Sequence, residues 1–221
     1  MGITERRKRE KTERRKAILN CARELILSQG VERVNMDDIA RKAELSKATL
    51  YLYFPGKEIL FNEICEESAR FFLDHVKPLL ETGVSGMDAM RCFWRGYVEL
   101  FGNFDEMLII FKVRSFLNPG LPFISMEEQT KSPNVYSILL ILKTLIEQCK
   151  AEGLFDPALD SEMATRLLLS MFSTTIDNTA RLPAETRKSP ARLNEMTKAF
   201  QLIVYGFARE GINRSSLNIT E

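Results

Sequence analysis

Residue patterns that carry enzyme chemistry are largely missing from this sequence. The chain has 221 residues but only one histidine, His75. It contains no nucleophile elbow, no glycine-rich loop of the kind that cradles a phosphate, and no cluster of metal ligands at regular spacing. A Ser-His-Asp site would have to use His75, whose place in an apolar helical stripe favours a surface or core role. The sequence therefore argues against catalysis and predicts neither a metal nor a cofactor.

Cysteine pairs and long apolar runs are also missing. The four cysteines lie far apart and form no C-x-x-C pair, and no secretion signal is evident, so neither a disulfide framework nor a zinc site is expected. No run approaches the roughly 18 apolar residues of a membrane-spanning helix. These absences favour a protein of the reducing cytoplasm that makes no membrane contact.

Positive charge is concentrated at the start of the chain. The whole sequence has a formal net charge of +1. Residues 1–57 contain 14 Lys and Arg against 8 Asp and Glu, a net charge of +6, which leaves −5 on the remainder. This segregation favours a polyanionic partner for the first quarter of the protein.

Apolar residues recur every three or four positions along most of the chain, and no stretch alternates as a strand does. The fold is therefore expected to be all-α. Residues 1–11 are expected to fray and 212–221 to form a polar tail. Residues 118–131 are expected to form either a loop that could act as a lid or a disordered segment. Helices are predicted over 12–29, 36–43, 47–54, 60–76 with an interruption at Pro78, 86–102, 105–117, 133–152, 161–181 and 190–210.

Two of these predicted helices are short and nearly adjacent. Asn35 can cap the first and Ser46 the second, and the turn between them is Glu44-Leu45-Ser46. This spacing is that of a helix-turn-helix, in which the second helix enters the major groove of DNA. On spacing alone, a pair of short helices that only pack against each other remains an alternative.

The residue types around this turn are more specific than the spacing. Segment 36–57, MDDIARKAELSKATLYLYFPGK, followed by Glu58 and Leu60, resembles the amino-terminal domain of the TetR family of transcriptional regulators. The family pattern runs through dIA, then S-x-x-TLY-x-YF, then KE-x-L. The resemblance implies a three-helix DNA-binding domain at 1–56 and a larger helical domain for effector binding and dimerisation at 57–221. It further implies a repressor that a small-molecule effector releases from its operator.

The resemblance also assigns DNA contacts to individual residues. Short side chains at the start of the recognition helix permit close approach to base edges, and the tyrosines that follow touch the DNA backbone or bases. A lysine at the start of the long helix adds its charge to free N–H groups facing a phosphate. Partly buried packing for the tyrosines and simple solvation for the lysines remain open. The expected DNA-binding residues are Asn35, Lys47, Ala48, Thr49, Tyr51, Tyr53 and Lys57.

Two positions depart from the family pattern. Met36 stands where a threonine is common, so Asn35 could supply the missing polar contact, and Glu44 replaces the usual turn glycine. The basic residues between Arg6 and Lys16 form either an arm that contacts phosphates or the minor groove, or a solvated and disordered tail.

A recognition helix this short buries little surface for specific binding alone. The family resemblance implies a homodimer on an operator with two-fold symmetry. The last two predicted helices carry apolar faces suited to this contact, although the same faces could belong to the intramolecular core. The residues expected at the dimer interface are Leu167, Met171, Thr175, Met196, Phe200, Ile203 and Phe207.

Aromatic residues are dense between Phe71 and Tyr136. Core packing explains most of them, but by the family resemblance these helices enclose a pocket for a small apolar effector, with a few polar groups in its wall. His75 is one possible polar group. The residues expected to line the pocket are Phe72, Trp94, Tyr97, Phe111, Arg114 and Tyr136.

Two other functions remain open. A DNA-binding adaptor on the same fold would use the larger domain to bind a protein partner instead of a small molecule. A thiol sensor would use Cys65, Cys92 or Cys149, but each lies on an apolar helical face without an activating cation, which favours buried, unreactive thiols.

Overall fold

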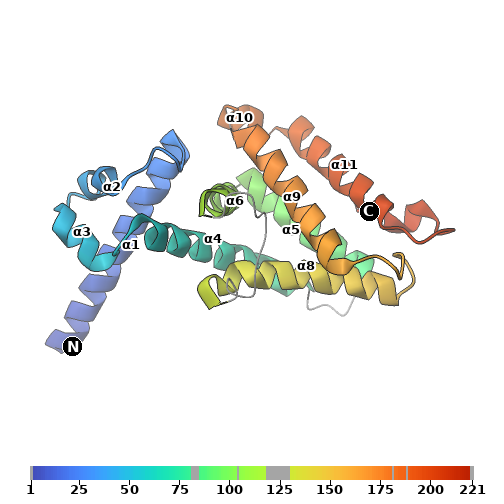
Figure 1. Cartoon of the computed structure of the whole chain (residues 1–221), viewed down its shortest axis with the longest axis horizontal. Coiled ribbons are helices and arrows are strands. Elements are labelled where there is room, and N and C mark those ends of the chain that lie inside the picture. Colours follow the sequence, from blue (N-terminus) through green and yellow to red (C-terminus); the bar gives the residue numbers. More distant parts are fainter. Residues whose placement is uncertain are drawn as a thin grey trace. The chain divides into compact units, whose positions relative to one another are not determined.

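The computed structural model describes residues 2–80, 85–103, 105–117, 130–180, 182–187 and 189–219. Within these ranges the regular structure is helical, apart from an isolated bridge between Phe155 and Ala208, so the prediction of an all-α fold is confirmed. The helices in Figure 1 are α1 (Ile3–Gln29), α2 (Met36–Lys42), α3 (Lys47–Tyr53), α4 (Lys57–Leu80), α5 (Gly86–Asn103), α6 (Glu106–Leu117), α8 (Pro133–Ala151), α9 (Ser161–Ala180), α10 (Ala184–Arg187), α11 (Pro190–Gly206) and a final 3-10 turn, η1 (Arg214–Leu217).

The chain divides into two compact units, Met1–Cys65 and Glu66–Glu221. The sequence placed a domain boundary after Gly56, where α4 begins. The smaller unit extends further because the first turns of α4 pack within it: the guanidinium of Arg15 on α1 binds the carboxylate of Glu63, with Nε 2.7 Å from Oε1. The smaller unit therefore includes the start of α4 as well as the three predicted helices.

Within the smaller unit, helices α1, α2 and α3 pack around one apolar core (Figure 1). Ile18, Ala22 and Ile26 recur on one face of α1 and are at most 1% exposed. Ile39 of α2 and Leu50 of α3 are fully buried. Fully burying one such side chain stabilises a fold by about 1.5–3 kcal/mol, so these spacings fix which face of each helix turns inward.

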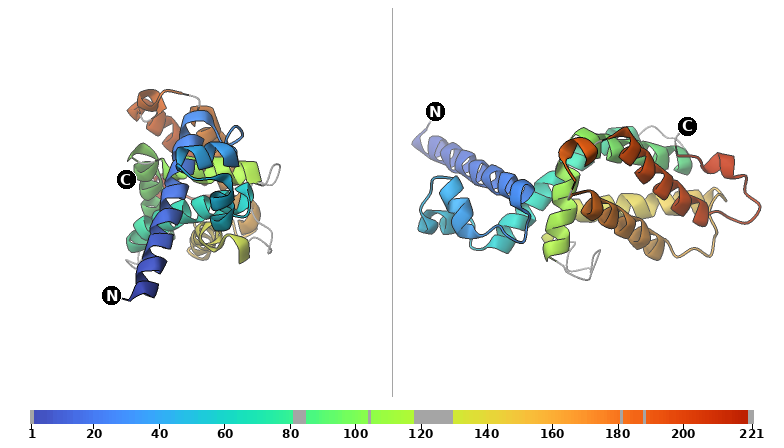
Figure 2. Two further views of the ribbon diagram at one scale, coloured as in Figure 1. Left: turned by 90° about the vertical axis from the view of Figure 1, so that its left-hand side faces the viewer. Right: turned by 90° about the horizontal axis from the view of Figure 1, so that it is seen from above.

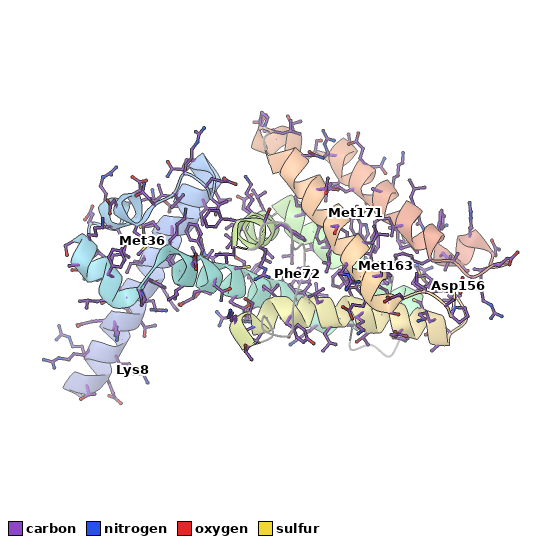
Figure 3. All side chains as sticks on the ribbon, viewed as in Figure 1. Lys8, Met36, Phe72, Asp156, Met163 and Met171 are labelled. Carbon is purple, nitrogen blue, oxygen red and sulfur yellow. The ribbon has the colours of Figure 1, made fainter. Side chains whose placement is uncertain are left out.

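The first turns of α1 differ from the sequence prediction. Residues 1–11 were expected to fray, but α1 begins at Ile3. The carboxylate of Glu5 accepts a hydrogen bond from the backbone N–H of Gly2 at 3.1 Å, which caps the helix. Ion pairs spaced four residues apart, Arg6 with Glu10 and Arg9 with Glu13, have Nε–Oε1 distances of 2.8 Å. Side chains around Lys8 project from these turns into solvent (Figure 3).

The larger unit is built on α9, which packs against α8, α6 and α11, while α5 packs against α8 and α6. Figure 2 shows α9, in orange, running beside α11, in red. Stacked aromatic rings join α5, α9 and α11. The ring centroids of Trp94 on α5 and Phe200 on α11 are 4.4 Å apart, and those of Tyr97 on α5 and Phe172 on α9 are 4.6 Å apart. Most of the aromatic cluster is thus core.

The start of α8 is held by a carboxylate from α4. The two carboxylate oxygens of Glu66 accept hydrogen bonds from the backbone N–H groups of Asn134, at 2.8 Å, and Val135, at 3.1 Å. These are N–H groups that a helix cannot satisfy internally.

Most of the loop predicted at 118–131 lies outside the described residues, and its last two residues, Thr130 and Lys131, are helical.

The chain after α11 packs onto the larger unit, so the prediction of a polar tail at 212–221 was wrong for the described part of that segment. Leu217 and Ile219 are at most 4% exposed. The Nε of Arg91 on α5 donates to the carbonyl oxygen of Asn218 at 2.6 Å, and the Nε2 of Gln201 on α11 donates to that of Leu217 at 2.8 Å. Leu217 and Ile219 stand among polar residues and show no helical periodicity, so the sequence did not predict that they are buried.

Two smaller differences concern helix ends. α4 continues past Pro78 to Leu80, because a proline near the end of a helix removes only one backbone donor. The short helix α10 at Ala184–Arg187 was not predicted. None of the described helices is long and apolar enough to cross a lipid bilayer.

Candidate nucleic-acid interface

Helix α3 turns one face to the core and the other to solvent. Leu50 is fully buried, whereas Lys47, Ala48 and Tyr51 are exposed. Residues three and four positions apart share a helical face, so these three side chains form a single surface, with Tyr51 41% exposed. The exposed face of α3 therefore presents a cation, a small side chain and an aromatic hydroxyl together.

The turn before α3 is fixed by backbone geometry. Glu44 adopts a φ of 56°, in the left-handed region that favours glycine, and the backbone N–H of Leu45 donates to the carbonyl oxygen of Ala40 at 2.9 Å. The Oγ of Ser46 then accepts from the backbone N–H of Thr49 at 3.1 Å. A non-glycine residue with positive φ stores backbone strain that the surrounding fold must offset. Glu44 thus holds the left-handed conformation that a glycine would adopt with less strain.

Lys47 is paired with an acidic residue of α2. Its Nζ lies 2.7 Å from the Oδ1 of Asp37, and both side chains are more than half exposed. The hydrogen bond and the negative charge of Asp37 raise the pKa of Lys47, so the ammonium is fully charged at neutral pH. Lys47 remains accessible, but a carboxylate lies beside it.

Thr49 and Asn35 serve as capping residues as well as candidate contacts. The Oγ1 of Thr49 lies 2.7 Å from the Oγ of Ser46. The Oδ1 of Asn35 accepts from the backbone N–H of Asp38 at 2.9 Å, so Asn35 caps α2 as predicted. Its Nδ2 amide group still has two protons to donate to a phosphate. Met36, beside it, is 7% exposed and belongs to the core.

Lys57 is engaged within the smaller unit. Its Nζ donates to the carbonyl oxygen of Val31 at 3.1 Å and lies 5.0 Å from the centre of the Phe61 ring. Burial lowers the pKa of Lys57. An ammonium has three protons to donate, so a phosphate contact stays a prediction. The hydrogen bond to Val31 also connects α4 to the loop after α1.

Sequence reasoning missed the role of Arg15. We assigned it with the rest of the basic run to an arm or a tail, but its Nη1 donates to the carbonyl oxygen of Tyr53 at 2.7 Å. Its guanidinium also lies over the ring of Phe54, 4.1 Å from the centroid. With the ion pair to Glu63, these contacts anchor the end of α3 to α1 and α4. Nothing in the local sequence distinguishes Arg15 from its basic neighbours.

A hollow of about 660 Å³ lies between the start of α2 and α3. It combines basic and acidic side chains around the backbone of the loop that precedes α2. Its walls are Glu32, Arg33, Val34, Asn35, Met36, Asp37, Asp38, Arg41, Lys47, Tyr51 and Lys57. Four of the seven predicted DNA-binding residues therefore line one concave surface of the smaller unit.

Comparison with known proteins also identifies the smaller unit as a DNA-binding domain. Residues 18–64 match the family described as bacterial regulatory proteins, tetR family. Over 204 residues the chain is 26% identical to YdgC, an uncharacterised HTH-type transcriptional regulator of Bacillus subtilis (strain 168), and the match covers 90% of this chain and 95% of that protein. The chain carries a TetR-family DNA-binding domain at residues 18–64. It is a DNA-binding transcriptional regulator with an amino-terminal helix-turn-helix.

Solved structures of TetR-type regulators share its fold. The fatty acid degradation regulator FadR from Bacillus halodurans aligns with a TM-score of 0.64 at 18% identity, covering 89% of this chain and 97% of that one. AibR, solved in complex with isovaleryl coenzyme A and operator DNA, aligns with a TM-score of 0.59 at 22% identity, covering 81% and 96%. The likeness extends over both units of the chain.

The six residues predicted to line an effector pocket all lie in the larger unit. Phe72, Trp94, Tyr97, Phe111 and Arg114 are at most 5% exposed. Tyr136 is half-buried. Trp94 and Tyr97 are in direct contact, with ring centres 5.2 Å apart, and the Nε1 of Trp94 donates to the Oγ1 of Thr197 at 3.2 Å. The Oη of Tyr97 is buried and has no hydrogen-bond partner among the described residues.

The seven residues predicted at the dimer interface divide into three groups by exposure. Met196, Phe200 and Phe207 are at most 5% exposed and belong to the core of the larger unit. Leu167 is 52% exposed. The remaining three, Met171, Thr175 and Ile203, are half-buried. The sequence could not separate these groups because apolar residues of α9 and α11 lie both in the core and on the surface.

The remaining candidate groups are His75 and the cysteines. The Nε2 of His75 lies 3.3 Å from the Oε2 of Glu99. No group of three possible metal ligands occurs among the residues that the structure describes. Cys65 and Cys149 are buried, and burial raises the pKa of Cys149 to about 12, which disfavours the reactive thiolate.

Proposed function

We propose that this TetR-family regulator is a repressor that binds a two-fold-symmetric operator as a homodimer and leaves it when a small apolar molecule enters the larger unit. The observation that carries the DNA-binding half is the exposed face of α3, which Ser46 caps and Arg15 anchors. A rigid, uncovered face with a cation and hydroxyl groups suits the base edges and phosphates of a major groove.

The buried hydroxyl of Tyr97 supports the effector half of the proposal. The ring of Tyr97 stacks against those of Trp94 and Phe172, and burial raises the pKa of the hydroxyl, so it stays neutral. Leaving a buried hydroxyl without a partner costs about 1–3 kcal/mol. A ligand that is mostly apolar but carries one hydrogen-bonding group would recover that cost, and would find apolar walls around it.

Relatives fit this reading. KstR2 of Mycolicibacterium smegmatis, 20% identical over 70% of this chain and 74% of that protein, is named a transcriptional repressor. AibR binds isovaleryl coenzyme A as well as operator DNA. The acyl part of such a thioester joins an apolar chain to a polar carbonyl, which matches the chemistry around Tyr97. The adaptor hypothesis, in which a protein partner replaces the effector, has no comparable support.

Exposed apolar side chains on α9 and α11 support the homodimer. Met163 and Leu167 lie four residues apart on α9 and are 54% and 52% exposed, and Leu202 on α11 is 70% exposed. The two helices pack side by side (Figure 1). Pairing the same two helices from a second copy would bury these side chains in a four-helix arrangement.

Selection of bound DNA from a random pool tests the operator half. We expect one palindromic sequence, with specificity altered by Lys47→Ala and Tyr51→Ala but unaffected by Leu27→Ala, a change at an exposed leucine of α1. If both variants at α3 select the same sequence as the parent protein, the residue assignments are wrong. Failure to select any sequence would overturn operator binding itself.

Titration with acyl coenzyme A thioesters and free fatty acids tests the effector half. A compound that binds the larger unit should weaken operator affinity, and operator should weaken its binding by the same factor, because coupling between two sites is reciprocal. Tyr97→Phe removes only the hydroxyl, so it should reduce effector affinity while leaving operator affinity unchanged. A ligand that binds tightly yet leaves operator affinity unaltered would contradict the proposal.

A further inference from the structure

Leu52 has the largest exposed fraction among the exposed large apolar side chains of the described residues. It is 82% exposed, compared with 70% for Leu202 and 54% for Met163. Single exposed leucines are common on protein surfaces. Leu52 differs because it lies on α3, four residues after Ala48 and directly after Tyr51, and thus on the face already assigned to DNA.

The chemistry of α3 restricts what can cover Leu52. The helix, KATLYLY, has no acidic residue, and Lys47 makes the start of its exposed face cationic. Phosphates and most base edges need hydrogen-bond donors or acceptors, which leucine lacks. The apolar group that a base presents in the major groove is the 5-methyl of thymine.

The neighbouring side chain favours such a close approach. Ala48 lies one turn before Leu52 on the exposed face and carries only a methyl group. A small residue there lets the helix come near the base edges, so a longer apolar side chain one turn later can reach them. On this face Leu52 is continuous with the surface formed by Lys47, Ala48 and Tyr51.

We propose that Leu52 contacts the 5-methyl group of a thymine in each operator half-site and so selects thymine at that position. This inference rests on the proposed operator binding through α3, and it adds a specificity-determining residue that the family resemblance did not assign. Burying one methyl-sized group corresponds to roughly a fourfold change in affinity per half-site.

Replacing thymine by deoxyuridine tests the contact, because the two bases differ only in the 5-methyl group. The operator obtained by selection is synthesised with one symmetric pair of thymines replaced at a time, and the affinity of the full-length protein is measured for each. We expect one pair at which the replacement weakens binding by roughly fourfold per half-site. In Leu52→Ala the loss at that pair should fall below about twofold.

Several results would overturn the inference. One is an equal effect of deoxyuridine on the parent protein and on Leu52→Ala. Another is an operator in which no thymine is sensitive to the replacement. A third is a change in the oligomeric state of Leu52→Ala, measured by light scattering, which would assign Leu52 to a protein contact. Because Leu52 is exposed and alanine is an excellent helix former, Leu52→Ala should fold. Leu27→Ala serves as control and should keep the thymine dependence of the parent. If the parent protein itself selects and binds no operator sequence, the proposed function is refuted, and the inference about Leu52 is not the part that failed.

Discussion

The ammonium of Lys47, the first residue of α3, forms an ion pair with the carboxylate of Asp37, the second residue of α2, at 2.7 Å. The pair links the two helices of the helix-turn-helix across their exposed sides. Asp37 can orient Lys47, but it also brings a negative charge to a surface that must approach phosphates. Operator binding therefore requires Lys47 either to keep this partner or to exchange it for DNA.

Removing the charge of Asp37 should strengthen binding to DNA of any sequence. We expect Asp37→Asn to raise affinity for random duplex DNA several-fold, because a carboxylate no longer opposes the phosphates. Lys47→Ala should reduce the slope of log affinity against log salt concentration by about 1 if Lys47 contacts a phosphate. Fluorescence anisotropy at several salt concentrations measures both. If Asp37→Asn has the same effect with and without Lys47, the two side chains are not coupled.

The Glu66 carboxylate should contribute measurably to the stability of the larger unit. Glu66→Ala leaves the N–H groups of Asn134 and Val135 without this acceptor, so we expect the free energy of unfolding to fall by about 1–3 kcal/mol. Glu66→Gln keeps one acceptor oxygen and should lose less. Urea unfolding followed by circular dichroism gives these values, with the exposed Glu210→Ala as control. Equal stability of Glu66→Ala and the parent would show that solvent replaces this cap without cost.

Glycine at the turn before α3 should stabilise the smaller unit. Because Glu44 has a φ of 56°, Glu44→Gly removes backbone strain, and we expect a gain of about 1 kcal/mol in the free energy of unfolding. The neighbouring Ala43 has a φ of −83°, so Ala43→Gly should be destabilising instead. Thermal and urea unfolding distinguish the two changes. A loss of stability in Glu44→Gly would mean that the side chain of Glu44, not its backbone, matters at this turn.

The basic first turns of α1 should add salt-dependent affinity. We expect deletion of residues 1–11 to weaken operator binding and to flatten its dependence on salt concentration, since several cations would be lost from the surface. The change in slope should be smaller than the number of cations removed, because Arg6 is paired with Glu10. An unchanged slope would exclude contact between this segment and DNA.

The fold was predictable from the sequence wherever one face of a helix is buried. α2 and α3 were located to within a residue or so because Asn35 and Ser46 provide caps and Ile39 and Leu50 provide the buried face. The start of α1 was missed, since residues 4–14 are exposed and this part of the helix is held by ion pairs on the surface. Apolar periodicity carries no information about such a segment.

The candidate site was predictable in residue type but only partly in role. Lys47 and Tyr51 lie exposed on α3, where the resemblance placed them. The contacts of Lys57 with Val31 and of Arg15 with Tyr53 join residues that are distant in the sequence. The pattern of a single sequence does not predict which distant residues come into contact. Leu52 escaped attention because an apolar residue in a helix is ordinarily assigned to the core.

The helical form of the first residues sets the reach and direction of their charges. A helix rises about 1.5 Å per residue, less than half the roughly 3.3 Å of an extended chain, so this segment spans far less distance than a flexible arm of equal length. Each residue also turns by about 100° around the axis. Inserting one residue between Lys11 and Arg14 would therefore swing all the preceding basic side chains to another side of α1 while lengthening it very little. Any DNA contact made by this segment should depend on its angular phase more than on its length.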